Sequence, residues 1–532
     1  MKKEIIKDGL ETIGRLRMPM LHWLKDVLDT YHNESNSLAY YDLIAGIWLE
    51  HFMHVVYAEW IKSRTKLLES YKEPTLELST TPAEFYKLIV NSTDYHLNLR
   101  MAIYSIHNDI NLSLCLQKKE DKLTNGVFIS SPWNAKKIFK KILFRVISRS
   151  NAKVLICSPA FKCSPKDWIL ALYKLRHLAR YDNLDDFISV RIKYDHSWRY
   201  SNSIHSGTSD DFLGVLKCLL PLCIPAVFLE GFKEYREKVL LLNKAQASIV
   251  YTATGLDTNL TFKFLVAEWK KNGTILLNHQ HGGGYGMYDL HVLEDFEKRV
   301  SDYFYSWGWT SKNRKVLPLS VGIPNLRHAK RSKQILLNCN ECHRNIYRLH
   351  FYPMPGTMKK VISNTIDFVL GLPEHKNLLI RPYHHDCGWN FLNKLKNVAP
   401  NAKYDTGYRR LISYKRFAES RIVVHNVHGT GCLESLALNI PTLCFFEADI
   451  YKFRKDARPY TKALEEVGIL HRSGKEAALF LLGVWNEVEI WWQKPEVQEA
   501  RKAFCEKYAN FSPNWPQLWR TEFKRILSLN SK

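Results

Sequence analysis

The stretch from residue 277 to residue 286 reads LNHQHGGGYG and combines residue types that suit catalysis. Glycine is used where the backbone must turn sharply or approach a ligand closely. Histidine is the side chain whose proton affinity is most easily tuned near neutral pH. We therefore expect His281 to act as a catalytic base or to stabilise charge during a reaction. The neighbours expected to contact a substrate are Gln280, Gly282, Gly283, Gly284 and Tyr285.

A second polar cluster, HNVHGTGCLES, begins at His425. It follows an apolar run and precedes a helical pattern, so its glycines would lie at a helix N-terminus, where the helix dipole favours a phosphate. A carboxylate one turn further on could accept hydrogen bonds from a ribose. An ordinary capped helix would give the same pattern. The residues expected to bind a nucleotide here are His428, Thr430, Gly431, Glu434 and Ser435.

A third cluster, RPYHHDCGW, begins at Arg381. An arginine beside His384 and His385 suits recognition of a carboxylate or a phosphate. Asp302 and Glu230 lie near strand ends or turn signals and complete the set of catalytic candidates, although each alone could equally be a cap or a surface group. No Asp-x-Asp metal motif stands out. We therefore expect phosphate charge to be met by arginine, histidine and helix ends, with no metal and no cofactor.

Two literal motif matches point to other chemistry. His281 and the three glycines after it match the oxyanion loop of lipases and esterases, but that chemistry also needs a Gly-x-Ser-x-Gly elbow, which the chain lacks. The segment from Cys339 to His343 fits the Cys-x-x-Cys-His pattern of haem attachment. A zinc site would want a second pair of ligands at suitable spacing nearby, and none stands there. The sequence therefore favours neither site.

The elements that must position these clusters alternate between strands and helices from about residue 150. Short apolar runs predict strands, and the longer patterned segments between them predict helices. The runs are 153–157, 248–252, 274–278, 303–307, 378–381, 421–425 and 442–446. Each polar cluster follows one of these runs, where a parallel sheet binds its ligands. Two α/β halves of the parallel-sheet type, joined near residues 323–333, are the simplest architecture.

The two ends of the chain are predicted to be helical. We expect a helical N-terminal region over 1–130, a first α/β domain over 131–330, a second over 331–474 and a helical tail over 475–532. The segment KKIFKKILFRVISR, residues 136–149, has one apolar face and one basic face. Such a helix could lie on an anionic membrane surface or simply pack on its own domain.

The composition allows large cores and favours anionic partners. The chain has 532 residues, 46% of them hydrophobic, with 76 Lys and Arg against 53 Asp and Glu, for a net charge of +23. A balance this basic suits nucleic acid, phosphorylated substrates or an acidic membrane. Eleven cysteines without a disulfide framework suit a reducing compartment. With no signal-like or spanning segment in view, we expect a cytoplasmic protein, at most peripheral at the inner face of the cytoplasmic membrane.

The chain as a whole resembles a family of transferases encoded in bacterial O-antigen and other surface-polysaccharide gene clusters. The segments that carry the resemblance are Trp48-Leu49, Leu220-Pro221 to Glu230, Gln280 to Gly286, Ser301-Asp302 to Trp309, Arg381 to Trp389 and Leu433 to Thr442. The resemblance implies a GT-B glycosyltransferase fold, with two Rossmann-like domains facing a cleft. The C-terminal half would then hold the activated sugar and the N-terminal half the acceptor. His428 departs from the smaller or hydroxylated residue expected before the Gly-Thr-Gly.

More distant similarity extends to capsule enzymes that transfer Kdo from a CMP donor and to glycerophosphate polymerases. We therefore expect a glycosyltransferase of surface-polysaccharide synthesis (lipopolysaccharide O-antigen or capsule), using a CMP-activated ulosonate of the Kdo or sialic-acid type slightly ahead of a UDP-hexose. Its partners would be the nucleotide-sugar donor and a free or lipid-linked glycan acceptor. The alternatives are a polyol-phosphate transferase with a CDP donor and a non-catalytic binder of polyanions. A nucleic-acid binder should show aromatic residues interleaved with basic residues along one surface, whereas here the glycines and histidines concentrate at two strand ends.

Overall fold

The computed structural model of the chain describes residues 3–65, 73–108, 127–129, 153–160, 178–181, 188–204, 211–242, 246–312, 315–322, 332–349, 355–373, 377–407, 410–446 and 452–530. These residues form two compact units, each described by itself. Unit 1 consists of Met1–Ser158, Ala179–Leu276 and Asn345–His350. Unit 2 consists of Pro159–Leu178, Leu277–Arg344 and Phe351–Lys532. The predicted basic helix at 136–149 lies outside the described residues, and so do its contacts.

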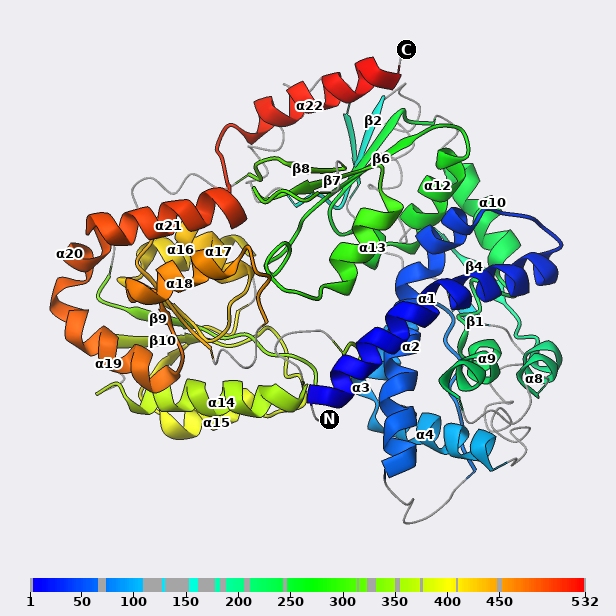
Figure 1. Cartoon of the computed structure of the whole chain (residues 1–532), viewed down its shortest axis with the longest axis horizontal. Helices are drawn as coiled ribbons and strands as arrows, with labels where there is room; N and C mark the ends of the chain where they lie inside the picture. Colours follow the sequence, from blue (N-terminus) through cyan, green and yellow to red (C-terminus); the bar gives the residue numbers. More distant parts are fainter. Residues whose placement is uncertain are drawn as a thin grey trace. The chain divides into compact units, whose positions relative to one another are not determined.

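Unit 1 begins with helices that pack on a buried central helix. That central helix, α2, contacts α1, α4, α9 and α12, and α1 runs beside it in Figure 1. Because neighbours cover α2 on all sides, it is buried around most of its circumference rather than along one face. Charges inside the bundle are paired, as where the Arg17 guanidinium contacts Asp42 (2.6 Å) and Glu50. The helices are α1 (Lys3–His32), α2 (Leu38–Thr65), α3 (Pro82–Asn91), α4 (Thr93–His107), α8 (His196–Ile204), α9 (Phe212–Cys223), α10 (Phe232–Leu242), α11 (Gly255–Thr258) and α12 (Leu260–Lys270).

A six-stranded parallel sheet forms the centre of the C-terminal half. Its strands are β9 (Ile335–Asn338), β10 (Leu378–Arg381), β11 (Lys403–Tyr404), β12 (Ile422–His425), β13 (Thr442–Phe445) and β14 (Leu470–His471). Their order is β11-β10-β9-β12-β13-β14, and every neighbouring pair is parallel. Numbered along the chain, this order is 3-2-1-4-5-6, the arrangement of a dinucleotide-binding Rossmann sheet. Runs such as Ile-Val-Val-His are buried throughout because helices cover both faces.

The helices of this half alternate with the strands and continue into the tail. They are α14 (Pro355–Leu370), α15 (Phe391–Val398), α16 (Arg410–Glu419), α17 (Thr430–Ala437), α18 (Arg458–Glu466), α19 (Gly474–Val484), α20 (Val488–Trp492), α21 (Pro495–Tyr508) and α22 (Trp515–Asn530), with a short 3-10 helix η4 (Trp485–Glu487).

The other six-stranded sheet has the order β3-β2-β5-β6-β7-β8. The pairings of β2 with β5, β6 with β7 and β7 with β8 are parallel. These elements are β2 (Val154–Cys157), β3 (Leu178–Tyr181), β5 (Ile249–Thr252), β6 (Ile275–His279), α13 (Val292–Val300), β7 (Tyr303–Ser306) and β8 (Val316–Pro318). A separate antiparallel pair joins β1 (Val127–Ile129) to β4 (Val190–Ile192). The last helix, α22, returns to this part of the chain, where the Trp519 ring packs on His279 and Tyr305.

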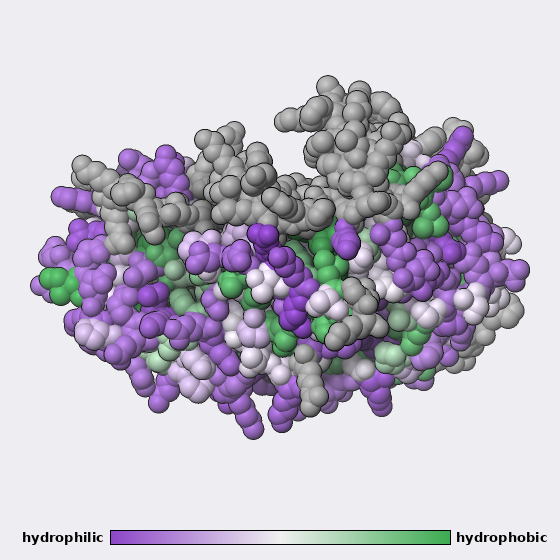
Figure 2. Space-filling view, turned by 90° about the horizontal axis from the view of Figure 1, so that it is seen from above, coloured by the Kyte–Doolittle hydropathy of each residue, from purple (hydrophilic) through white to green (hydrophobic). Residues whose placement is uncertain are grey.

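The predicted α/β fold class is confirmed. The chain is α/β, with two largely parallel sheets and with helical regions at both ends. Each of the seven apolar runs predicted as a strand lies within one residue of an observed strand. The domain boundaries stay a prediction. Within the described part of the chain, no helix has both the length and the apolar character needed to cross a bilayer. The face drawn in Figure 2 is mostly hydrophilic, which fits the high charge of the sequence.

Candidate functional site

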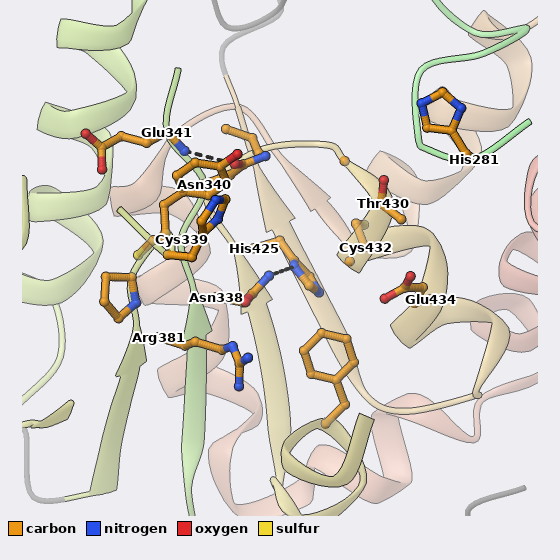
Figure 3. Close-up of a pocket in the computed structure, with 17 residues that line it drawn as sticks. His281, Asn338, Cys339, Asn340, Glu341, Arg381, His425, Thr430, Cys432 and Glu434 are labelled. Atoms are coloured by element: carbon orange, nitrogen blue, oxygen red, sulfur yellow. Dashed lines mark hydrogen bonds between the residues drawn. The ribbon is translucent and has the colours of Figure 1, made fainter. Parts of the chain in front are cut away.

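A cavity of about 500 Å³ opens at the carboxyl edge of the C-terminal sheet, entirely within unit 2. It lies where β9, β10 and β12 end, and its wall includes Asn338, Arg381 and His425 from the last positions of these strands. In the strand order of this sheet, β9 and β12 are the neighbours between which the winding direction reverses. Open α/β sheets bind their ligands at that reversal, and the volume is typical of small-molecule sites. Figure 3 draws the lining residues, with Asn338 and His425 facing each other at the strand ends and Thr430 at the start of the neighbouring helix.

The start of α17 forms one side of the cavity. Gly429, Thr430 and Gly431 line the cavity, and Gly429 is an N-cap without a side chain to cap the helix. The positive end of the helix therefore faces the space, which favours an anion. Gly431 leaves room for its neighbours, because a Cβ there would lie 3.0 Å from Asn338 Nδ2 and 3.2 Å from His425 Cε1 and both side chains would have to shift slightly.

Arg381 supplies a buried positive charge on the opposite wall. The residue is 5% exposed, and its Nη1 donates to Asp405 Oδ2 at 3.1 Å. Its Nη2 is buried without a hydrogen-bond partner among the described residues. A guanidinium nitrogen in this state suits an anionic ligand, because an unpaired buried donor is costly. Because Asp405 accepts from Nη1, the nitrogen that Arg381 has available for a ligand is Nη2.

Two further groups define the charge of the cavity. Burial, followed by the nearby His428, lowers the pKa of His425 to about 3, so its ring is neutral at neutral pH. Its Nδ1 can then accept from Asn338 Nδ2 at 3.2 Å, while Nε2 donates to Ser435 Oγ at 3.0 Å. Burial, followed by the charge of Asp386, raises the pKa of Glu341 to about 7. The carboxyl group on this wall is therefore partly protonated near neutral pH and opposes an anion less than a free carboxylate would.

The glycine-rich loop after β6 brings His281 to the cavity. Gln280 holds the loop, because its Oε1 accepts from the Trp307 backbone N–H (2.9 Å) and the Trp309 indole N–H (2.8 Å), and its Nε2 donates to Gly282 O at 2.9 Å. The His281 side chain is 20% exposed, and its Nδ1 lies 3.6 Å from Oε1 of the fully buried Glu297. A buried carboxylate behind an imidazole orients the ring and stabilises its protonated form.

Contacts within unit 2 fix this loop against the C-terminal sheet. Gly283 N donates to Thr430 Oγ1 at 2.9 Å, and a Cβ at Gly283 would lie 2.8 Å from Thr430 N and 2.9 Å from Gly429 C. Tyr288 donates its hydroxyl to His428 O at 2.6 Å. The next helix adds an ion pair of 3.0 Å between Glu294 and Arg454. The loop that carries His281 thus packs directly on the first turn of α17.

Some of the residues singled out in the sequence come together at this cavity. Those that line it are His281, Arg381, His384, Thr430, Gly431 and Glu434. Those that are not among its lining residues are Gln280, Gly282, Gly283, Gly284, Tyr285, His385, His428 and Ser435. Most of the second group support the first. The Tyr285 hydroxyl lies 3.3 Å from His281 Nδ1, and Ser435 is hydrogen-bonded behind His425.

The two other carboxylates lie elsewhere. Glu230 is in unit 1, where the fully buried Arg199 donates to both its oxygens, at 2.6 Å and 2.9 Å. That geometry is typical of a structural ion pair. Asp302 precedes β7 and is not among the residues lining the cavity. Catalytic roles for both stay predictions without support from the cavity.

Several residues that line the cavity are not predicted from the sequence. They are Asn338, Cys339, Asn340, Glu341, Pro382, Tyr383, Phe417, His425, Val427, Gly429 and Cys432. The usable signal for the first four was the apolar run Ile335–Asn338 followed at once by polar residues.

The chain belongs to the LIC12162 family transferases, whose family model matches residues 2–523. The predicted enzyme class, a transferase, is therefore confirmed. No curated protein matches the sequence. Among solved structures, MnaA from S. aureus in complex with UDP is similar over 71% of this chain and 98% of that one, with 11% identity and a TM-score of 0.40.

Two further solved structures are similar at the same level. UDP-GlcNAc 2-epimerase from Neisseria meningitidis bound to UDP-GlcNAc matches 70% of this chain and 99% of its own, with 11% identity and a TM-score of 0.39. WaaG, a glycosyltransferase involved in lipopolysaccharide biosynthesis, matches 69% and 99%, with 11% identity and a TM-score of 0.33. Likeness this distant carries no argument about the substrate of this chain.

Proposed function

We propose that this transferase moves a sugar from a nucleotide-activated donor to a glycan acceptor, and that the donor is a CMP-activated ulosonate. The observation that carries the proposal is the cavity at the reversal point of the C-terminal sheet, which combines a helix N-terminus, a buried unpaired guanidinium nitrogen and a histidine at one side. A nucleotide phosphate suits the start of α17, where backbone N–H groups and the helix dipole act together. Glu434, one turn into α17, is suited to a ribose hydroxyl.

The choice of a ulosonate rests on a second anionic requirement. A CMP-ulosonate carries a sugar carboxylate in addition to the phosphate, whereas a UDP-hexose has no carboxylate. Arg381 and His384 lie on the wall formed by the end of β10, separate from the start of α17, and could take that carboxylate. Arg381 already neutralises Asp405 through Nη1, so the ligand would be bound through Nη2.

The reaction that fits these groups is displacement of the phosphate at the anomeric carbon. An acceptor hydroxyl forms the new carbon–oxygen bond, the bond from the anomeric carbon to the phosphate oxygen breaks, and CMP leaves with the electron pair. His281 would take the hydroxyl proton, with Glu297 stabilising the resulting imidazolium. The start of α17 would stabilise the negative charge that develops on the departing phosphate.

The biological setting rests on the sequence resemblance described above. We propose that the acceptor is a free or lipid-linked glycan in the synthesis of a bacterial surface polysaccharide. A lipid-linked acceptor would also give a role to peripheral contact with anionic membrane.

Nucleotide binding to the full chain is the experiment that tests this function. Calorimetry should detect CMP at micromolar concentration, with weaker responses to UDP and CDP. Arg381→Gln should abolish turnover with a CMP-ulosonate while changing CMP affinity less than tenfold, because the guanidinium is assigned to the carboxylate. Arg472→Gln is the matched control, since this arginine is 69% exposed and forms a surface ion pair with Glu465 at 3.4 Å.

The outcomes separate the alternatives. Clear UDP binding without a CMP response would contradict the ulosonate donor and leave a glycosyltransferase. A CDP preference would favour polyol-phosphate transfer. Nanomolar RNA affinity at physiological salt without any nucleotide binding would contradict the enzyme proposed here.

A further inference from the structure

Two loops beside the cavity bring together three side chains that commonly bind metals. His343 follows β9, and His385 and Cys387 follow β10, all within unit 2. One potential ligand atom from each side chain lies within 4.8 Å of the other two. Among the described residues, these three side chains therefore form a group that could hold one metal ion. The His343 and His385 rings have centroids 5.4 Å apart.

The spacing of these atoms is close to that of a coordinated ion. With bonds of about 2.0 Å to nitrogen and about 2.3 Å to sulfur, tetrahedral zinc places neighbouring ligand atoms about 3.3 to 3.8 Å apart. Starting from separations within 4.8 Å, the three atoms need to close by about 1.5 Å at most to reach that geometry. His385 is exposed, so its side chain can turn without disturbing the core, while Cys387 is buried and supplies a fixed anchor.

The backbone around the cluster is already clamped. Arg344 N donates to Cys387 O at 2.9 Å, and the Trp389 indole donates to Cys342 O at 2.8 Å. Cys387 N donates to Glu341 Oε1 at 3.1 Å. These bonds tie the loop after β9 to the loop after β10 on both sides of the cluster. The two backbone segments that carry the ligands are therefore held near one another before any ion binds, which lowers the entropic cost of binding.

The chemistry of the donors selects the ion. One thiolate and two imidazoles favour Zn²⁺ over Mg²⁺ or Ca²⁺, which prefer oxygen ligands. Asp386 lies outside the cluster, and its Oδ1 accepts from the backbone N–H groups of Gly388, Trp389 and Asn390 at 3.1 to 3.2 Å. Three protein ligands leave a fourth position for water.

We propose that His343, His385 and Cys387 bind one Zn²⁺ ion that ties the loop after β9 to the loop after β10. Cys339, Asn340 and Glu341 of the first loop and Tyr383 and His384 of the second also line the cavity. The ion would therefore fix the relative position of two parts of the cavity wall. His343 is the histidine of the Cys-x-x-Cys-His pattern, and the other two ligands, His385 and Cys387, follow β10. This proposal is independent of the identity of the donor.

Metal analysis of the full chain without an affinity tag tests the site. Mass spectrometry of the purified protein should find about one zinc per chain, and Cys387→Ser and His385→Ala should each weaken zinc binding at least about 100-fold, since even changes to groups behind the ligands cost 10- to 100-fold. His384→Ala is the matched control, because this exposed histidine is adjacent to His385 but outside the cluster, and it should keep the zinc.

Cobalt substitution gives a second and independent measurement. Protein stripped of metal and loaded with Co²⁺ should show a thiolate-to-cobalt charge-transfer band and the visible spectrum of tetrahedral cobalt. The band should be absent in Cys387→Ser. His385→Ala serves if Cys387→Ser fails to fold, since its exposed side chain contributes little to the core. Zinc content that is unaffected by these variants, or Co²⁺ binding without a thiolate band in the wild-type protein, would overturn the proposal.

Discussion

Replacing Gly283 by alanine should separate the glycine-rich loop from α17. An added Cβ would lie 2.8 Å from Thr430 N, 2.9 Å from Gly429 C and 3.2 Å from Gly429 Cα. These are backbone atoms of the helix start, so no side chain can turn aside to make room. The adjacent Gly282 is the matched control, because the nearest atom to its added Cβ is Thr430 Oγ1 at 3.4 Å, an ordinary contact.

The size of the effect follows from three contributions. Forcing one methyl group into a packed site costs about 1 to 3 kcal/mol. Displacing the loop also weakens the 2.9 Å bond from Gly283 N to Thr430 Oγ1, and a typical hydrogen bond contributes about 1 kcal/mol. The lower entropy of the unfolded alanine chain offsets about 0.4 to 1 kcal/mol. The net loss of unfolding free energy for Gly283→Ala is therefore about 1 to 4 kcal/mol, whereas Gly282→Ala should change it by less than about 1 kcal/mol.

Denaturant unfolding of both variants, followed by tryptophan fluorescence, measures this difference. The midpoint should fall clearly for Gly283→Ala and stay near the wild-type value for Gly282→Ala. Calorimetry with CMP should show weaker binding for Gly283→Ala, because the helix start that lines the cavity must shift. Equal midpoints for the two variants would refute the close contact between the loop and α17, whatever the reaction of the enzyme.

Three further predictions concern the same unit. His281→Ala should lower turnover by about two to four orders of magnitude while CMP still binds, and near-normal turnover of the folded variant would dismiss the histidine as a base. Burial lowers the pKa of His428 to about 4, below the value near 6.5 of an unfolded chain, so the unfolding free energy should fall as pH drops from about 6.5 to about 4. His428→Asn should flatten that fall in denaturant titrations at a series of pH values, and an unchanged slope would argue against it. Gln280→Ala removes one hydrogen bond within the loop and two from Trp307 and Trp309, and should lower the unfolding free energy by about 2 to 4 kcal/mol, measured by the same titration.

The sequence predicts the strands well where they are buried apolar runs next to turn signals. It predicts the cavity only in part, because it misses β9, Ile335–Asn338. Only three residues of this strand, Ile335 to Leu337, are apolar, and so short a run cannot be assigned by periodicity alone. The omission matters because β9 lies beside β12, where the winding reverses, and the residues that follow it form a wall of the cavity. Asn338, Asn340 and Glu341 therefore have no predicted role, although each is polar and close to a strand end.

The attachment of the His281 loop to α17 could not be predicted from local patterns. Gly283 and Thr430 are 147 residues apart, and no sequence rule links them. The run of glycines is readily recognised as a candidate site, but glycine is needed at each position for a different reason. Gly284 has φ +90°, a conformation that side chains disfavour, whereas Gly283 is needed for close approach to another part of the chain.

This attachment has a consequence for how the proposed transfer is organised. His281 follows β6, which belongs to the sheet that contains β7 and β8. The loop that carries it nevertheless donates a hydrogen bond to Thr430, the first residue of α17, which follows β12 of the C-terminal sheet. The base and the helix end that would hold the leaving phosphate therefore belong to one packed unit. Their separation is set by the Gly283–Thr430 contact and by the Tyr288–His428 bond of 2.6 Å behind it. Pre-organisation of this kind would hold His281 and the donor phosphate at a fixed separation. The hydroxyl of the glycan acceptor is then the group that must still be brought into place.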